Sequence, residues 1–232
     1  MEATNKPNTR KTNLELLRII AMLMIILHHF ALYSGFSFSV ENAFGNKITV
    51  DILSMFGKLG VTLFIMISGY FYDKASFKLN KFLKLLITVW IYSIIGLTIG
   101  IITNSNEVSF INIIKAALPV TLGRYWFITC YILIYIFSPY VKTVIDKMER
   151  KDLKHMLIIA FIIWSVIAIV PSSKTFMNEF IILEFVYFVG AYIRKYDINI
   201  LNNKKRIVCI IGIILCMVII MVMLEVLSNY IY

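Results

Sequence analysis

The chain has 232 residues, of which 60% are hydrophobic and only 16% charged, and its formal net charge is +10. This composition lies far outside the range of soluble domains and indicates a polytopic membrane protein with room for about seven spans. The basic residues occur in short clusters between apolar runs, a pattern that sets membrane orientation, so the net charge gives no indication of nucleic-acid binding.

The apolar runs predict an all-α bundle of membrane helices, because stretches of this length favour membrane helices over buried strands. We place seven spans over Leu14–Tyr33, Phe56–Phe71, Phe82–Thr103, Tyr125–Val144, Met156–Val170, Phe180–Ile193 and Ile207–Leu227. Residues 1–13 are a predicted tail, and residues 14–232 are expected to form one transmembrane domain. The segment Ser34–Met55 is the longest expected external loop, and Val108–Leu122 is expected to be re-entrant or interfacial.

The distribution of lysine and arginine predicts a cytoplasmic N-terminus. With that orientation, the inside segments carry 17 basic residues and the outside segments carry five. Because cytoplasmic loops are enriched in Lys and Arg, this imbalance favours the N-terminus inside, which leaves Tyr232 outside. A first apolar run of about 20 residues that contains an arginine and two histidines favours an uncleaved first span over a signal peptide.

Ionisable residues lie inside the first predicted span. Arg18 and His29 are eleven positions apart, close to three whole helical turns, so both lie on one stripe about 16 Å apart along the axis. Glu15 lies one turn before Arg18 and is placed to orient it, whereas His28 points about 100° away from His29. Intramembrane ionisable groups are costly and are functional candidates by default. The stripe therefore selects His29 as the partner of Arg18.

The chemistry of this stripe suits anion recognition at one end and proton transfer at the other. A guanidinium stays charged and presents a fork of donors to phosphate or carboxylate groups. A histidine is a natural general base near neutral pH. The structural alternative is an arginine that snorkels to the interface and a histidine that hydrogen-bonds between helices.

A second group of candidates is the segment Gly57–Tyr72 with the basic residues that follow it. Gly60, Ser68 and Gly69 would let another backbone approach closely. Lys78, Lys81 and Lys84 form a basic edge that could hold the phosphates of a nucleotide-like donor or contact anionic lipid.

Other features favour packing. Arg124 and Trp126 are expected in an outer interfacial belt, and Gly96 and Gly100 form a small-xxx-small pair typical of close helix packing. Glu184 is a carboxylate inside the sixth span to which the sequence assigns no partner. The cysteines have no metal-ligand spacing, and we expect no metal site. The chain has no P-loop, which gives no reason to propose an ATP-driven pump.

The chain resembles the acyltransferase-3 family of integral membrane acyltransferases. NLELLRIIAMLMIILHHF resembles the family's opening pattern of an acidic residue, an arginine three positions later, and a histidine after ten intervening residues, which Glu15, Arg18 and His29 meet. GVTLFIMISGYFY and KLNKFLKLL resemble the next two motifs, although lysine stands where many members have arginine. YWFITCYILIYIFSPYV and FVYFVGAYIRKY are similar to later helices.

The resemblance implies transfer of an acyl group, commonly acetyl, from acyl-CoA to a hydroxyl of a surface polysaccharide or lipid-linked glycan. The implied location is a cell membrane, with the bacterial cytoplasmic membrane as the expected one. It implies His29 as catalytic base or acyl carrier, Arg18 for donor binding or orientation, and Lys78, Lys81 and Lys84 for the coenzyme A phosphates. Family members typically have more helices, so we expect the domain to be incomplete at its C-terminus. Two alternatives stay open. One is a transport or export component with Arg18, His29 and Glu184 along its path. The other is a truncated, non-catalytic partner of envelope-synthesis proteins.

Overall fold

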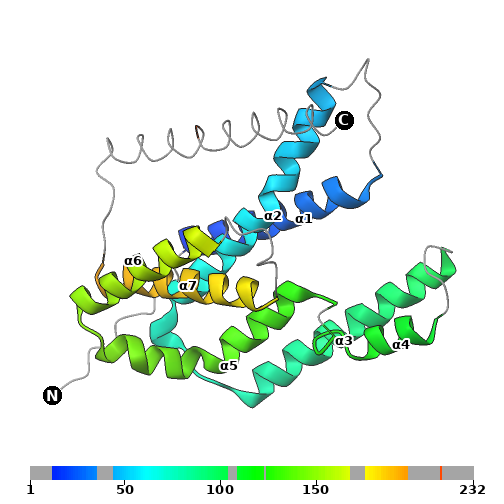
Figure 1. The fold of residues 1–232 in the computed structure, drawn as a ribbon. Coiled ribbons are helices and arrows are strands. Elements are labelled where there is room, and N and C mark those ends of the chain that lie inside the picture. The colour runs from blue at the N-terminus through cyan, green and yellow to red at the C-terminus, as the bar shows by residue number, and fades with distance from the viewer. Residues whose placement is uncertain are drawn as a thin grey trace. The chain divides into compact units, whose positions relative to one another are not determined.

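The computed structural model describes residues 12–35, 44–103, 109–122, 124–167, 176–197 and 215. Over these residues the regular secondary structure is entirely helical (Figure 1). Its elements in chain order are α1 (Thr12–Tyr33), α2 (Phe44–Tyr70), the 3₁₀ helix η1 (Tyr72–Lys74), α3 (Leu79–Ile102), α4 (Phe110–Ala117), α5 (Trp126–Lys147), α6 (Arg150–Ile167) and α7 (Phe176–Lys195). The predicted all-α class is thereby confirmed.

Four helices are long and apolar enough to cross a membrane, and they coincide with the first four predicted spans. They are α1, the Thr49–Tyr70 part of α2, α3 and α5. The fifth and sixth predicted spans fall on α6 and α7, which also carry charged residues such as Lys154 and Glu184. The seventh, Ile207–Leu227, lies outside the described residues apart from Leu215, so the total of about seven spans stays a prediction.

The second helix begins earlier than the sequence analysis predicted. The external loop was predicted to reach Met55, but α2 starts at Phe44 and runs without interruption to Tyr70. Apolar residues at helical spacing, such as Val50 and Leu53, continue the pattern of the span beyond its predicted start. The hydroxyl of Ser54 also donates a hydrogen bond of 2.7 Å to the Asp51 carbonyl inside this helix. The prediction of a loop over 44–55 was therefore wrong.

The described residues belong to two compact units. One contains α1 and α2 as far as Phe64, and the other runs from Ile65 to Lys195. In the first unit, α1 buries Ala21 completely, while large apolar side chains such as Leu23 and Ile26 are more than half exposed. Exposed apolar faces of this kind are expected where a helix meets lipid.

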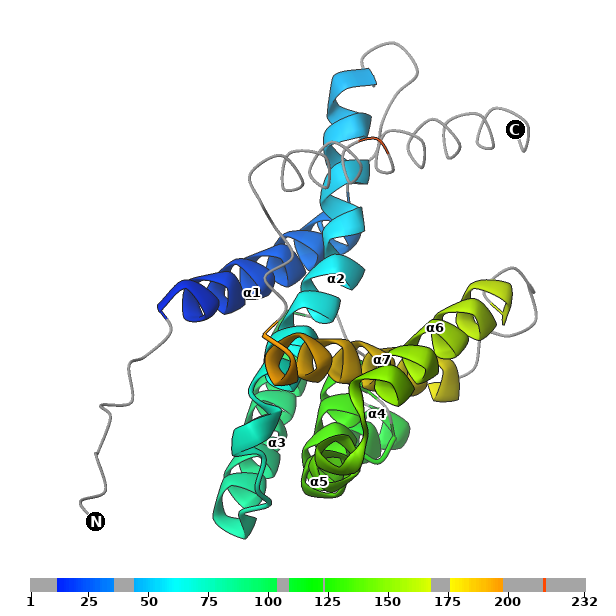
Figure 2. The same cartoon turned by 90° about the vertical axis from the view of Figure 1, so that its left-hand side faces the viewer.

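In the second unit, α7 packs against both α5 and α6, and α4 lies along α3 (Figures 1 and 2). The α2–α7 contact rests on two glycines. A Cβ at Gly69 would meet the Tyr187 carbonyl group, and a Cβ at Gly190 would meet the Met66 carbonyl oxygen. Each helix thus presents a glycine to the backbone of the other, the arrangement by which membrane helices approach closely.

The predicted small-residue pair on α3 behaves differently. Gly100 is buried, but a Cβ at Gly96 would have nothing within 4 Å among the described residues. The expectation that Gly96 mediates close packing was therefore wrong for the part of the chain that the structure describes. Helical spacing identifies which residues share a face, but it does not identify the face that a neighbouring helix covers.

Candidate functional site

Arg18 of α1 contacts α2 in the first unit. Glu15 and Arg18 are both half-buried. The Arg18 guanidinium carbon is 5.7 Å from the centre of the Phe64 ring, within the range of a cation–π interaction. An arginine held against an aromatic face keeps its charge and its remaining donors, so it can still recognise an anion.

The two adjacent histidines have different surroundings. His28 donates from Nδ1 to the Ser54 carbonyl oxygen of α2, and its ring occupies the space beside Gly57. His29 is exposed, stacks on Tyr33 with ring centres 5.8 Å apart, and meets the His28 ring edge-on at 5.3 Å. As the spacing predicted, the two rings point in different directions. His28 is the one that packs on α2, and His29 presents its ring outside that contact.

Close backbone contact holds α1 against α2. A Cβ at Gly60 would lie 2.7 Å from the Ala21 carbonyl oxygen and 2.9 Å from a side-chain carbon of Ile25. The close approach that the sequence predicted at Gly60 is therefore present, and so is the one predicted at Gly69. Because Gly60 lies one turn before Phe64, this contact keeps the ring of Phe64 in register with Arg18.

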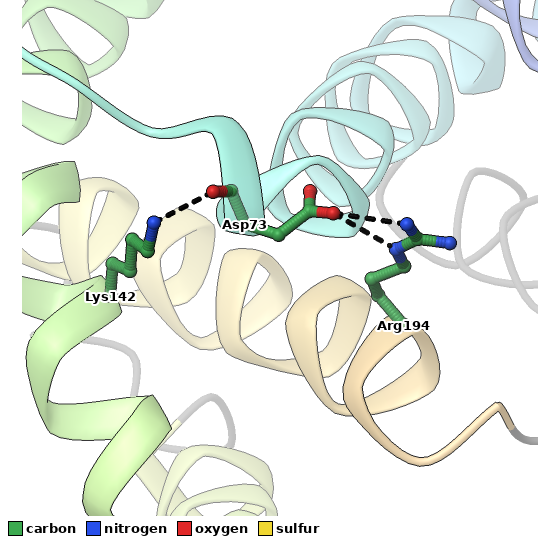
Figure 3. A network of polar contacts seen from close by, with 3 residues as sticks. All are labelled: Asp73, Lys142 and Arg194. Carbon is green, nitrogen blue, oxygen red and sulfur yellow. Dashed lines mark hydrogen bonds and ion pairs between the residues drawn. The ribbon is translucent and has the colours of Figure 1, made fainter. Parts of the chain in front are cut away.

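In the second unit, Asp73 of η1 is the centre of a polar network (Figure 3). Its Oδ2 accepts two hydrogen bonds from Arg194 of α7, at 3.0 Å from Nη2 and 3.3 Å from Nε. Its main-chain carbonyl accepts a 2.7 Å hydrogen bond from Nζ of Lys142 in α5. The Arg194 guanidinium also lies 5.5 Å from the Tyr70 ring centre. The hydrogen bond to Asp73 raises the pKa of Arg194, which keeps this guanidinium charged.

Further contacts join the C-terminal ends of α5 and α7. Nζ of Lys195 donates to the carbonyl oxygens of Met148 at 2.6 Å and Asp146 at 3.2 Å, and also to that of Ile145. Lys195 therefore caps the last turn of α5, where carbonyls have no partner within the helix. The segments joined by these contacts are the α2–α3 connection, the end of α5 and the end of α7. The sequence analysis predicted all three on one membrane side, and which side that is stays a prediction.

These contacts distinguish two groups among the basic residues of the second unit. Lys142, Arg194 and Lys195 are engaged by the protein itself. Lys78, Lys81 and Lys84, the predicted phosphate ligands, are exposed at the start of α3. The main chain of Lys78 is held by the Tyr135 hydroxyl, which lies 3.1 Å from its amide nitrogen and 3.4 Å from its carbonyl oxygen. The side chains of this second group are thus accessible to an anion from outside.

The sequence analysis did not single out Asp73, Tyr135, Lys142, Arg194 or Lys195 as site residues. Their contacts join positions that are far apart in the chain, 121 residues in the case of Asp73 and Arg194. The available signal was an acidic residue at the end of the second predicted span, followed by a basic run. Helical spacing by itself does not pair such a residue with another helix.

The remaining candidates lie elsewhere in the second unit. The Arg124 guanidinium lies 5.9 Å from the ring centre of Tyr125, just before α5. Glu184 of α7 is half-buried, and its Oε2 is inaccessible to solvent and has no hydrogen-bond partner among the described residues. Among those residues, no group of three or more His, Cys, Asp or Glu side chains could hold a metal ion.

A cavity of about 370 Å³ separates α3 from the turn that follows α4. Leu86, Ile87 and Trp90 line it from α3, and Leu118 and Pro119 line it from the turn. This lining is mostly apolar, so the cavity suits a hydrocarbon group better than a polar one. The re-entrant or interfacial position expected for Val108–Leu122 stays a prediction.

Comparison with known proteins gives one match. Residues 11–232 match the family model described as "Acyltransferase domain", the acyltransferase-3 model, so the match covers nearly the whole chain. No curated protein and no solved structure matches the chain. The matched residues include the whole of α1 and every residue of the Asp73 network.

Proposed function

The chain belongs to the acyltransferase-3 family, and from this premise we propose that it is a membrane-bound O-acyltransferase that uses acyl-CoA as donor. The acceptor in this proposal is a hydroxyl of a surface polysaccharide or a lipid-linked glycan, and the acyl group is acetyl in the simplest case. The observation that carries the proposal is the family match over 11–232, which includes Arg18 and His29 on a helix long and apolar enough to cross a membrane.

In the proposed reaction, His29 takes the proton from the acceptor hydroxyl as that oxygen attacks the thioester carbonyl carbon. The new bond joins the hydroxyl oxygen to the acyl carbon, and the bond from that carbon to sulfur breaks. The departing thiolate takes a proton and leaves as free coenzyme A. The exposed ring of His29 supports this role, because a general base must be within reach of the acceptor.

Arg18 is the proposed anion-binding or orienting group, with Glu15 one turn before it. Its contact with the Phe64 ring would hold the guanidinium in place without using up its hydrogen-bond donors. Lys78, Lys81 and Lys84 are the proposed ligands of the coenzyme A phosphates. Their exposure, and the engagement of Lys142, Arg194 and Lys195 within the protein, support this assignment.

A second candidate function is transport or export of an anion or proton. The observation that favours it is Glu184, whose buried Oε2 has no hydrogen-bond partner among the described residues. Carboxylates at such positions are characteristic of proton relays in transporters. The two functions differ in what they consume, because an acyltransferase releases free coenzyme A and a transporter moves its substrate unmodified.

The test is release of coenzyme A from labelled acetyl-CoA by membranes that contain the chain, with candidate envelope glycans as acceptors. His29→Ala and Arg18→Ala are compared at equal expression with His28→Ala, a matched control on the next residue. Acceptor-dependent release that the first two substitutions abolish, and that His28→Ala retains, would support the proposed site. Release that survives His29→Ala would refute the role of His29. Transport of a substrate without coenzyme A release would favour the second function.

A further inference from the structure

The connection between α2 and α3 is held at both ends by side chains from other helices. Near its start, Lys142 binds the Asp73 carbonyl and Arg194 binds the Asp73 carboxylate. At its end, the Tyr135 hydroxyl contacts the main chain of Lys78. Three side chains, two from α5 and one from α7, therefore fix a segment that leads directly into the lysines at the start of α3.

The local structure makes these contacts specific to Asp73. In η1, Ala75 donates from its main-chain nitrogen to the Tyr72 carbonyl at 2.9 Å, and the Tyr72 side chain is only 6% exposed. The buried tyrosine fixes the turn, so the neighbouring carboxylate points to the end of α7, as Figure 3 shows. A guanidinium that donates twice to one carboxylate has both its distance and its direction fixed.

Stability alone is a weak reason for this ion pair. The side chains of Arg194 and Asp73 are 35% and 36% exposed, and solvent screens pairs at this exposure. Such a pair is better suited to selecting one position for the segment that carries it. The residues placed by that selection are the ones at the start of α3, because the α3 helix begins at Leu79.

We propose that Asp73 is a positioning residue that, through Arg194 and Lys142, holds the edge formed by Lys78, Lys81 and Lys84 in its anion-binding position. This inference rests on the proposed function, since it takes the anion to be the phosphate groups of acyl-CoA. Asp73 acts through the lysines and touches neither the acyl group nor the acceptor. Loss of the pair frees the connection, so the lysines lose their shared arrangement and bind the phosphates more weakly.

The experiment measures binding of coenzyme A to the purified full chain in detergent, together with KM and kcat for the acyl donor. The variants are Asp73→Asn, Arg194→Gln and the double variant, with Asp146→Asn as control because Asp146 is an exposed carboxylate near the end of α5. We expect Asp73→Asn to raise Kd and KM about tenfold with kcat nearly unchanged. The Kd of the double variant should not exceed the higher of the two single-variant Kd values, because each single substitution removes the same interaction.

A purely structural role would give a different pattern. If Asp73→Asn lowers the melting temperature and leaves Kd unchanged, or if Asp146→Asn raises Kd equally, the positioning role is refuted. Should Asp73→Asn fail to accumulate, Arg194→Lys gives the same test, because it keeps the charge and loses the two-pronged donation. An unchanged Kd in Arg194→Lys then overturns the inference. If the wild-type chain binds no coenzyme A, the proposed function itself fails.

Discussion

Substitution of Gly190 by alanine tests the reciprocal glycine contact between α2 and α7. The added methyl group would meet the Met66 carbonyl oxygen and would lie 2.9 Å from the Tyr70 nitrogen. Both obstacles are backbone atoms, so no side chain can turn away to make room. The helices must separate, and the neighbouring Gly69 then loses its close contact with the Tyr187 carbonyl group as well.

The expected cost follows from this geometry. Forcing an extra carbon into a closely packed contact typically costs about 1–3 kcal/mol, and the gain from replacing a helical glycine by alanine is at most about 1 kcal/mol. We therefore expect Gly190→Ala to lower the free energy of unfolding by roughly 1–2 kcal/mol, a change of about five- to thirtyfold in the folded-to-unfolded ratio.

The assay is unfolding by sodium dodecyl sulfate in mixed micelles, followed by helical circular dichroism. Gly96→Ala is the matched control, because a Cβ at Gly96 has nothing within 4 Å among the described residues. This control should leave stability unchanged or raise it by up to about 1 kcal/mol. Equal effects of the two substitutions would refute the idea that α2 and α7 meet backbone to backbone at Gly190.

Three further substitutions test other contacts. Gly60→Ala should destabilise the α1–α2 pair by about 1–3 kcal/mol in the same assay, because its Cβ would lie 2.7 Å from the Ala21 carbonyl oxygen; wild-type stability would contradict this contact. Lys195→Met should expose the last turn of α5 to faster amide hydrogen exchange, because the turn loses its capping ammonium; unchanged exchange would argue against the cap. Tyr135→Phe should raise the KM for the acyl donor about two- to fivefold with kcat retained, because it frees the main chain of Lys78; a fall in kcat alone would contradict this reasoning.

The sequence predicted the positions of the helices better than it predicted which helices contact one another. Long apolar runs located α1, α3 and α5 because a membrane span needs a certain length of apolar residues, and this requirement is local. The start of α2 was predicted too late, because its first turns are amphipathic rather than uniformly apolar. Hydropathy recognises a helix surrounded by lipid more readily than one with a polar face.

Part of the candidate site could also be predicted. Helical spacing separates His28 from His29, and the structure agrees, but only the packing of α1 on α2 reveals that His28 is the one that contacts α2. Glycine alone suggested close contact equally at Gly60 and Gly96, although among the residues that the structure describes only Gly60 of the two has a neighbour. The pairing of Asp73 with Arg194 is a tertiary contact over 121 residues, and no local pattern encodes it.

The cap that Lys195 forms on α5 has a consequence for biogenesis. It ties the end of α7 to Ile145, so the intervening chain of α6 and α7 becomes a closed loop. Both helices of this loop carry charged residues, which makes independent entry of either into a lipid bilayer costly. We therefore expect α6 and α7 to enter the bilayer together as a helical hairpin. The cap can form only after Lys195 has been synthesised, so the last turn of α5 is capped only once α7 has been made.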